Sequence, residues 1–299
     1  MDVSIIIVNY NTEGLVIDCI RSICEKTDGI DYEIIVIDNN SPNGISMLEK
    51  TYGNVVNIVK LQENIGFGRA NNEGIKIANG RNIFLLNPDT ILINNAVKIL
   101  SDFLDKNAKV GVCGGNLYDE ENKPTHSYMP ILPGIRWEIN QLLRWKLWKN
   151  WIYDRNFMYN HSGKPIKVGY ITGADMMIRK DVINKSGGFD KDFFMYYEET
   201  ELTWRIKKLG YEVYNLPQAK IQHLEGKSIS SNHKRQEKIM IGRNLYYTKT
   251  SSKAAKFIAD LISITDVITH YAQHFISRNN EELILDKKKL SYLKANLGR

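Results

Sequence analysis

Two adjacent carboxylates follow an aromatic run in the second half of the chain. Glu198 and Glu199 come directly after five bulky apolar residues, 193–197, and begin a segment with helical spacing. An apolar wall removes water from a carboxylate and raises its pKa, which suits a general base, although acids in a first turn also complement the helix dipole. Glu201 precedes Arg205 by four residues, the spacing of an ion pair. We therefore keep Glu198 and Glu199 as candidate bases.

A second group of residues could hold a divalent metal ion. Asp89 lies in the turn Asn87-Pro88-Asp89, directly after an apolar run. One carboxylate and one amide can bind Mg²⁺ or Mn²⁺ if diphosphate oxygens complete the ligand shell, but this composition is also that of an ordinary turn. His223 is followed by Gly226 and Ser228. An isolated histidine is more often a packed or solvated residue than a ligand, and these neighbours add weight to the alternative of a phosphate or metal contact.

Two further segments could contact a nucleotide. Asp38 ends an apolar run, and a buried carboxylate at that place needs a partner. It could accept a hydrogen bond from a nucleotide base or a ribose hydroxyl, or it could cap the following helix. Residues 64–74 combine small residues and amides with Arg69 at an expected helix start, which suits a base or phosphate or is simply structural. This segment is not a dinucleotide-binding loop, because it does not follow the first strand and lacks the third glycine.

Continuous apolar runs dominate the first hundred residues. Runs without polar alternation are typical of parallel strands that are buried on both faces, and segments with helical spacing lie between them. The pattern predicts an alternating α/β domain, with Thr12 as a helix N-cap. The expected strands cover residues 3–9, 32–38 and 82–87, and the expected helices follow Thr12 and cover 65–78 and 96–104.

Polar clusters end all three of these expected strands, at residues 9–12, 38–41 and 87–90. Ligands of open α/β sheets bind outside the carboxyl ends of the strands, so the three clusters should line one cleft. Beyond Gly115 the pattern is less regular, and it becomes helical and basic from about residue 230. Further strands are expected at 168–171, 176–179, 212–216 and 219–222, with a helix that ends at Gly210.

Composition is that of a folded globular chain. The 299 residues are 43% hydrophobic and 25% charged, which excludes a disordered or collagen-like polypeptide. No apolar run approaches the roughly 20 residues of a spanning helix, and the N-terminus lacks the features of a signal peptide. We read the three cysteines, Cys19, Cys24 and Cys113, as reduced packing residues. A cytoplasmic protein is expected.

The excess positive charge lies at the C-terminus. Residues 226–299 hold 14 basic and 6 acidic side chains, whereas residues 1–225 hold 26 and 28. Apolar residues recur there at helical spacing, and a tryptophan-rich basic segment lies upstream. Both features fit contact with an anionic membrane, whereas the alternatives are a solvated helical face or packing on the catalytic domain or a second subunit. These residues are Phe257, Leu261, Ile264 and Ile268, and upstream Trp137, Trp145, Trp148 and Trp151.

Taken in order, eight segments of the chain resemble the inverting family 2 glycosyltransferases, which have the GT-A fold, and within them the rhamnosyltransferase-like branch. The resemblance implies a nucleotide-diphosphate sugar donor, a metal ion, and a glycan or lipid-linked glycan acceptor in cell-surface polysaccharide synthesis. dTDP-rhamnose is the expected donor, followed by UDP-hexoses. The segments are residues 4–12, 33–41, 64–72, 86–90, 172–179, 188–190, 193–205 and 223–228.

By position, the resemblance assigns a role to each matching residue. Asp89 matches the metal-binding acid, His223 an accessory metal or diphosphate ligand, and Glu199 the catalytic base. This sequence departs from the family pattern in two places: Asn87 replaces the first acid of the metal motif, and Glu199 replaces an aspartate, which leaves Glu198 open as the base. Nucleotide-sugar contacts are expected from Tyr10, Thr12, Asp38, Asn40, Asn64, Arg69, Asn71 and Asn87, and acceptor contacts from Gly173, Ala174, Asp175 and Tyr196.

The expected domain organisation follows from the same match. Residues 1–228 form an α/β GT-A catalytic domain, with a nucleotide-sugar half at 1–115 and an acceptor half at 116–228, and residues 229–299 form a basic helical extension. No nucleic-acid partner is expected, and a homodimer stays open. Two other functions compete: a nucleotidyltransferase on a similar fold, which would need basic residues near residues 9–12, and a catalytically silent nucleotide-sugar-binding protein.

Overall fold

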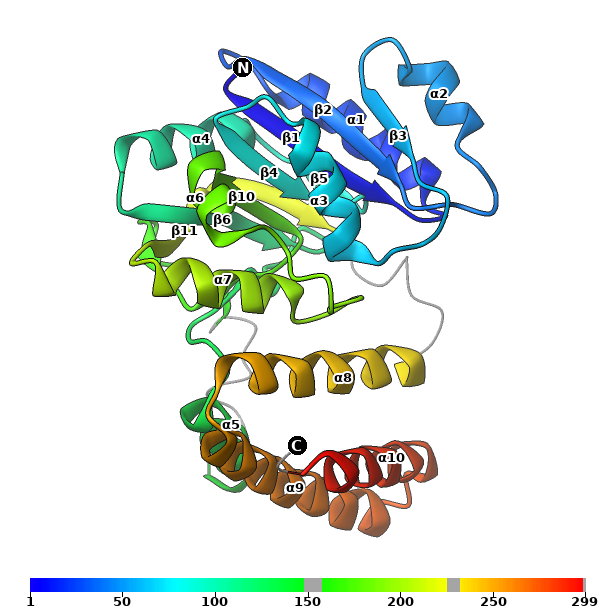
Figure 1. Ribbon diagram of the computed structural model, residues 1–299, viewed down its shortest axis with the longest axis vertical. Helices are drawn as coiled ribbons and strands as arrows, with labels where there is room; N and C mark the ends of the chain where they lie inside the picture. Colours follow the sequence, from blue (N-terminus) through cyan, green and yellow to red (C-terminus); the bar gives the residue numbers. More distant parts are fainter. Residues whose placement is uncertain (148–157, 225–231, 298–299) are drawn as a thin grey trace. The chain divides into compact units, whose positions relative to one another are not determined.

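The computed structural model describes residues 1–147, 158–224 and 232–297 (Figure 1). The chain divides into two compact units, one made of Met1–Pro130 and Arg155–Ser228 and the other of Ile131–Asp154 and Ile229–Arg299. The range expected for the catalytic domain, 1–228, therefore includes a segment that belongs to the second unit.

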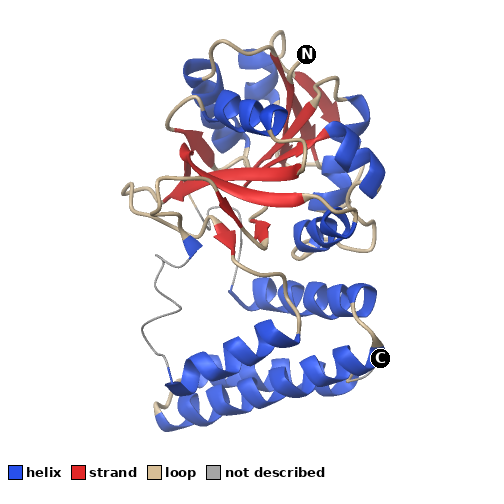
Figure 2. Ribbon diagram, turned by 90° about the vertical axis from the view of Figure 1, so that its left-hand side faces the viewer, coloured by secondary structure: helices blue, strands red, loops and turns tan. Residues whose placement is uncertain are grey.

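A nine-stranded mixed sheet forms the centre of the first unit (Figure 2). The strand order is β3-β2-β1-β4-β10-β6-β11-β5, with β8 paired to β11. Strands β3, β2, β1 and β4 run parallel, whereas β10 is antiparallel to both β4 and β6. The bounds are β1 (Val3–Asn9), β2 (Tyr32–Asp38), β3 (Asn57–Lys60), β4 (Asn82–Leu86), β5 (Thr90–Leu92), β6 (Val110–Tyr118), β8 (Ile166–Lys167), β10 (Asp175–Arg179) and β11 (Glu212–His223); β7 (Tyr128–Met129) and β9 (Tyr170–Ile171) form a separate pair.

Helices cover both faces of this sheet, which is why its inner strands lack polar alternation. All seven residues of β1 are buried: Ile5 and Ile7 belong to one apolar core, and Ile6 and Val8 belong to the other. This arrangement confirms the expected α/β class. The first core is covered by α1 (Glu13–Lys26), α2 (Ser46–Tyr52) and α4 (Ala96–Lys106), and the second by α3 (Phe67–Ile77), α6 (Lys180–Ser186) and α7 (Glu198–Lys208).

One local expectation is confirmed in position and another was wrong in part. Thr12 does occupy the N-cap position of α1, but its side chain makes no capping hydrogen bond, because its hydroxyl donates to Oδ1 of Asn9 at 2.9 Å. Cys24 is exposed and so does not act as a packing residue, whereas Cys19 and Cys113 are buried free thiols as expected.

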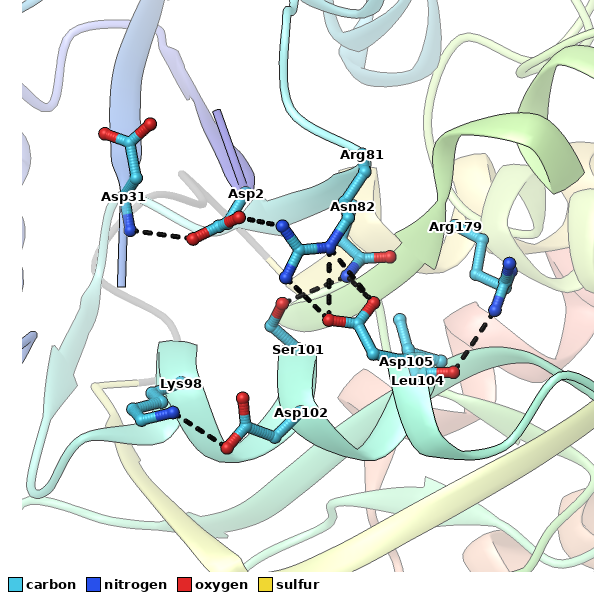
Figure 3. Close-up of polar contacts among 10 residues, drawn as sticks. All are labelled: Asp2, Asp31, Arg81, Asn82, Lys98, Ser101, Asp102, Leu104, Asp105 and Arg179. Carbon is cyan, nitrogen blue, oxygen red and sulfur yellow. Dashed lines mark hydrogen bonds and ion pairs between the residues drawn. The ribbon is translucent and has the colours of Figure 1, made fainter. Parts of the chain in front are cut away.

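Arg81 ties three elements together at the amino end of β4, away from the polar clusters at its carboxyl end (Figure 3). Its guanidinium donates to Oδ2 of Asp105 in α4 at 2.6 Å and also pairs with Asp2 before β1. Asn82 donates from Nδ2 to Oγ of Ser101 at 3.0 Å. The Arg81 hydrogen bond holds the pKa of the Asp105 carboxyl below its usual range, so the ionised form stabilises the fold.

Asp105→Asn should lower stability without affecting the carboxyl end of the sheet. Because the pair is partly exposed, we expect a loss of about 1 kcal/mol in the free energy of unfolding at pH 7. A lowered folded pKa gives stability above the unfolded pKa of about 3.9 that is lost as the pH falls further, so the difference from wild type should shrink below that pH. Urea titrations at pH 7 and pH 3 measure it, and a difference that persists at low pH contradicts the assignment.

The second unit is helical in its described residues: α5 (Ile135–Leu147), α8 (Asn232–Thr250), α9 (Lys253–Ile276) and α10 (Asn280–Asn296) (Figure 1). This confirms the expected helical C-terminal region. Of the tryptophan-rich segment, Trp148 and Trp151 lie outside the described residues. Within the described ranges, no helix has the length and apolar character needed to cross a bilayer.

Buried ion pairs join three helices of this unit. Arg243 of α8 donates from Nε to Oε1 of Glu138 in α5 at 3.1 Å and from Nη1 to Oδ1 of Asp260 in α9 at 2.9 Å. Lys256 donates to Oδ2 of the same Asp260 at 2.7 Å, and the hydroxyl of Tyr247 donates to Glu138. Two acids and two bases thus neutralise each other inside the unit, as buried charges require.

Candidate active site

A hydrogen-bonded cluster lies at the carboxyl ends of β1 and β2. Asn9 is paired in register with Asp38, and its Nδ2 donates to Oδ1 of Asp38 at 2.8 Å. The hydroxyl of Ser41 donates to the same oxygen at 2.6 Å, and both the amide and the hydroxyl of Thr12 donate to Oδ1 of Asn9. Asp38 is therefore buried but supported, and it does not serve as a helix cap.

Asn9 and Ser41 are functional candidates that the sequence analysis did not single out. Asn9 is fully buried at the last position of β1 and links Asp38, Ser41 and Thr12. A polar residue that ends a fully buried strand is the sequence signal for such a position. The cluster orients Thr12 and Asp38 before any ligand binds.

The start of α3 is joined to this cluster through two asparagines. The Nδ2 of Asn39 donates to Oδ1 of Asn64 at 3.0 Å, and the amide of Ile65 donates to Oδ1 of Asn39 at 3.0 Å. Asn64 also accepts from the amide of Gly66. Arg69 donates from Nε to the carbonyl of Ile65 at 2.6 Å, which places its half-buried guanidinium at the same loop.

Three other residues expected near the nucleotide differ in accessibility. Tyr10 and Asn40 are exposed, and Asn40 adopts a left-handed backbone conformation with φ of 62°. Asn71 is buried within α3, where its Nδ2 donates to the carbonyl of Phe67 at 3.1 Å. Tyr10 and Asn40 can therefore meet a ligand from solvent, whereas the side chain of Asn71 is turned to the backbone of α3.

The loop 172–175 contacts the turn that contains Asp89. The amide of Asn87 donates to the carbonyl of Ala174 at 3.0 Å. Asp175, the next residue, is fully buried, and its Oδ2 accepts from the amide of Gly115 in β6 at 2.5 Å. Burial raises the pKa of this carboxyl well above its usual range. Direct contact of Asp175 with an acceptor is therefore not supported, and we assign it to positioning β10 beside β6.

Asp89 and His223 are distant in sequence and meet in the fold. Thr90 of β5 is paired with His223 of β11, and Nε2 of His223 lies 3.4 Å from Oδ1 of the buried Asp89. The amide of Leu224 donates to the carbonyl of Asp89 at 2.9 Å, which fixes the turn. Among the described residues, no three His, Cys, Asp or Glu side chains gather as a metal site.

The donor set at Asp89 fits an ion that is only partly held by protein. One carboxylate oxygen and one imidazole nitrogen leave most of the coordination shell to other ligands. Mg²⁺ and Mn²⁺ bind in this way, with substrate phosphates and water completing their shells.

Glu198 and Glu199 open α7 after a constrained turn. Tyr196 and Tyr197 both have φ of 70°, a left-handed conformation that bulky residues rarely adopt and that persists only where the surroundings impose it. Glu198 is buried, and its stem lies against Gly68 of α3. Glu199 is half-buried and lies against Gly173, where a Cβ would be 3.8 Å from its Cγ. The stems of the two side chains therefore have different glycine neighbours.

Both glutamates have raised pKa values. Burial raises the pKa of Glu198 well above its usual range, and the negative charge of Glu199 raises it further. Burial also raises the pKa of Glu199, partly offset by backbone amides at the helix start. Oε2 of each is buried without a hydrogen-bond partner among the residues that the structure describes. Glu201, by contrast, binds Arg205 with both oxygens, at 2.8 and 2.6 Å, which confirms the ion pair expected from their spacing.

Glu198→Gln should make stability less dependent on pH. A raised folded pKa gives stability that is present below the unfolded pKa of about 4.3 and lost as the pH rises through the folded value. The free energy of unfolding of the variant, minus that of wild type, should therefore be larger at pH 8 than at pH 5. Urea titrations measure it, with Glu63→Gln at the surface as the control. An equal difference at both pH values contradicts the assignment.

Comparisons with known proteins now bear on this geometry. The family model "Glycosyl transferase family 2" matches residues 4–187, and a second, "Glycosyl transferase family group 2", matches residues 134–285. The chain belongs to glycosyl transferase family 2. The family resemblance of the sequence is thereby confirmed, and the first match contains Asp38, Asp89 and the loop 172–175.

Relatives of this family 2 glycosyl transferase include enzymes of glycan synthesis. The low-salt glycan biosynthesis hexosyltransferase of Haloferax volcanii is 26% identical over 211 residues, 69% of this chain and 62% of that protein. The N-acetylglucosaminyl-diphospho-decaprenol L-rhamnosyltransferase of Mycobacterium tuberculosis is 26% identical over 207 residues, 64% of this chain and 66% of that protein. The chain thus matches just under two thirds of these relatives.

Solved structures of low sequence identity share the GT-A fold, which confirms the expected fold class. GalNAc-T7, solved with UDP, GalNAc and Mn²⁺, has a TM-score of 0.58 at 15% identity and covers 83% of this chain and 50% of its own. Residues 1–349 of S. aureus TarS have a TM-score of 0.56 at 14% identity and cover 99% of this chain and 81% of their own.

Proposed function

We propose that this family 2 glycosyl transferase moves a sugar from a nucleotide-diphosphate donor to an acceptor hydroxyl with inversion, and that Glu199 is the base. The observation that carries the proposal is the loop 172–175. Glu199 lies against Gly173, and the next residue, Ala174, accepts from the amide of Asn87 in the turn that contains Asp89. A base for the acceptor and a group for the leaving diphosphate thus border the same loop, as a single displacement requires.

Glu199 suits the base better than Glu198. Glu198 is buried against Gly68, whereas Glu199 is half-buried and can meet a substrate at Gly173. The raised pKa of Glu199 makes it a stronger base once it is ionised. In the proposed reaction the oxygen of the acceptor hydroxyl attacks the anomeric carbon, and Glu199 accepts the proton of that hydroxyl. The nucleoside diphosphate leaves in the same step. Glu198 is the orienting neighbour, and Tyr196 and Gly173–Ala174 border the acceptor.

Asp89 and His223 are the proposed holders of Mg²⁺ or Mn²⁺. Their donor atoms, 3.4 Å apart, form a partial set that suits an ion shared with a diphosphate. When bound, such an ion neutralises charge on the departing diphosphate. Asp89 is buried, and the amide of Leu224 donates to its carbonyl, which fixes the backbone of the turn that carries the carboxylate.

Asp38, Thr12 and Arg69 are the proposed contacts for the base and ribose. The Asn9 cluster orients Asp38 and Thr12, and the Asn64 loop holds Arg69. Tyr10 and Asn40 are exposed beside them and can close over the nucleotide, and Asn87 borders the diphosphate. Asn64 itself acts by shaping the loop.

The donor, acceptor and location are proposed from the relatives. Because a rhamnosyltransferase that acts on a decaprenol-linked sugar and a hexosyltransferase are among them, we propose dTDP-rhamnose or a UDP-hexose as donor. The acceptor would be a glycan or lipid-linked glycan in cell-surface polysaccharide synthesis, used at the cytoplasmic face of the membrane. The proposed catalytic domain is residues 1–228 without 131–154, and the latter residues group with the extension at 229–299.

A donor screen tests the proposal and separates its competitors. Thermal unfolding is measured with a panel of nucleotide sugars, with and without Mn²⁺, because a ligand that binds only the folded state raises the melting temperature. Phosphorus NMR then follows the stabilising donor with an acceptor and, in a parallel sample, a nucleoside triphosphate with a sugar phosphate. Release of a nucleoside diphosphate supports the proposal, release of pyrophosphate from a triphosphate indicates a nucleotidyltransferase, and binding without turnover indicates a silent protein.

A further inference from the structure

The outward face of α9 is apolar along its whole length. Four large side chains on this face are strongly exposed: Phe257 (42%), Leu261 (42%), Ile268 (49%) and Phe275 (68%). Their spacing of four, seven and seven residues places them within one stripe of the helix. The other exposed residues of α9 after Lys253 are also uncharged, namely Ala254, Ile258, Thr265, Ala272 and Ile276.

Two charged residues within α9 are buried on the side that faces the other helices of the unit. Lys256 and Asp260 are buried and paired with each other, and Asp260 also pairs with Arg243 of α8. His274 contacts Oδ2 of the buried Asp286 in α10 at 2.7 Å, and α10 lies beside α9 in both views (Figures 1 and 2). Beyond Lys253, the helix therefore has its ion pair on the inside and large apolar side chains on the outside, the reverse of a helix that faces water.

A long exposed apolar face of this kind is expected to be buried by a binding partner. The helix α9 cannot bury it by spanning a bilayer. Lys256, Asp260 and Asp266 interrupt the apolar sequence of the helix, and no described helix qualifies as a membrane span. With 24 residues, α9 is about 36 Å long. A helix with one apolar face and low overall hydrophobicity lies in the plane of the headgroup layer.

The exposed charge of the helical unit indicates which cover suits this face. Lys253 and Arg278 flank the stripe at its two ends, and both are exposed. From residue 234 to residue 297, the exposed acids are two and the exposed bases are eight. These bases are Lys234, Arg235, Lys249, Lys253, Arg278, Lys287, Lys288 and Lys294, and the acids are Glu237 and Glu281.

We infer that the α9 face, defined as Phe257, Leu261, Ile268 and Phe275, binds the surface of an anionic membrane. Basic side chains around an apolar helix face attract anionic headgroups while the apolar side chains enter the acyl boundary. A second copy of the chain is a less suitable partner for this face. A two-fold contact through it would bring the positive charges of Lys253 and Arg278 in the two copies towards one another. The inference concerns binding alone and holds whichever donor the enzyme uses.

Vesicle co-sedimentation of the full chain tests the inference. We expect binding to vesicles of phosphatidylcholine with phosphatidylglycerol, little binding to phosphatidylcholine alone, and weaker binding at high salt. Leu261→Ser with Phe275→Ser should weaken binding about 10-fold or more, because two inserted side chains are lost. Lys253→Gln and Arg278→Gln should each weaken it about 5-fold at low salt. The control is Val55→Ser, an equally exposed apolar site in the first unit, which should bind as wild type does.

A fluorescent probe locates the contact. In a Cys24→Ser background, where Cys19 and Cys113 are buried, an environment-sensitive dye is attached to Ile268→Cys or to Val55→Cys. Anionic vesicles should shift the emission of the first to the blue and leave the second unchanged. Two results overturn the inference. The first is full vesicle binding by the variant that combines Leu261→Ser with Phe275→Ser. The second is a wild-type protein that does not bind vesicles but forms a concentration-dependent dimer, which is lost in this variant.

Discussion

Asp89→Asn is expected to reduce sugar transfer by about 10³-fold or more, because a bound metal ion contributes several kcal/mol of charge stabilisation. Asn keeps the shape of the side chain and removes the charge. The site offers one carboxylate beside His223, so its loss leaves an imidazole and a weak amide ligand. Binding of Mn²⁺ in the presence of a nucleoside diphosphate, followed by electron paramagnetic resonance, should weaken in parallel.

The matched control is Asp102→Asn. Asp102 pairs with Lys98 on the partly exposed face of α4, so the same chemical change occurs away from the cleft. This control should retain wild-type transfer and Mn²⁺ binding. If Asp89→Asn keeps full activity, or if wild type turns over unchanged in excess chelator, Asp89 does not hold a catalytic metal.

Glu199→Gln is expected to lower kcat by about 10²- to 10⁴-fold, the usual loss when a positioned base is removed. Donor affinity should change little, because Glu199 lies against Gly173 rather than in the Asp38 cluster. Glu198→Gln provides the comparison, and its effect on kcat should be smaller. If Glu198→Gln causes the large loss and Glu199→Gln does not, then Glu198 is the base.

The wild-type pH profile offers a second measure of the same residue. A general base works in its ionised form, so activity rises as the pH rises through its pKa. Since burial raises the pKa of Glu199, the acidic limb of kcat should lie above the ordinary glutamate value of about 4.3. The residual activity of Glu199→Gln should lack this limb.

Much of the first unit was predictable because its strands are buried on both faces. Strands β1 and β2 have the bounds expected from their apolar runs, Val3–Asn9 and Tyr32–Asp38. The convergence of polar residues at the carboxyl ends followed from parallel pairing, which the register of Asn9 with Asp38 bears out. Local composition was sufficient to predict this part of the fold.

Pairings between distant segments were not predictable from composition. Asp89 and His223 meet because β5 pairs with β11, and only the family resemblance had linked them. Asp175 and Asn71 looked like ligand contacts, yet each satisfies a backbone group inside the fold. A polar residue near a cleft can serve either the ligand or the chain itself, and the sequence does not distinguish these uses.

The helical unit shows the same limit in a different form. The stripe of Phe257, Leu261 and Ile268 was visible as helical spacing, but spacing does not reveal which face of a helix is covered. The structure supplies that information, because the ion pairs of Lys256 and Asp260 occupy the inner side. The apolar stripe therefore remains on the outside.

The anomeric configuration of the transfer product tests the central claim most directly. Proton NMR of the product, made with the donor and acceptor found by the screen, compares the new glycosidic linkage with that of the donor. A single displacement in which Glu199 accepts the proton of the acceptor must invert the anomeric carbon, so we predict a linkage of opposite configuration. A product that retains the configuration of the donor would contradict the account.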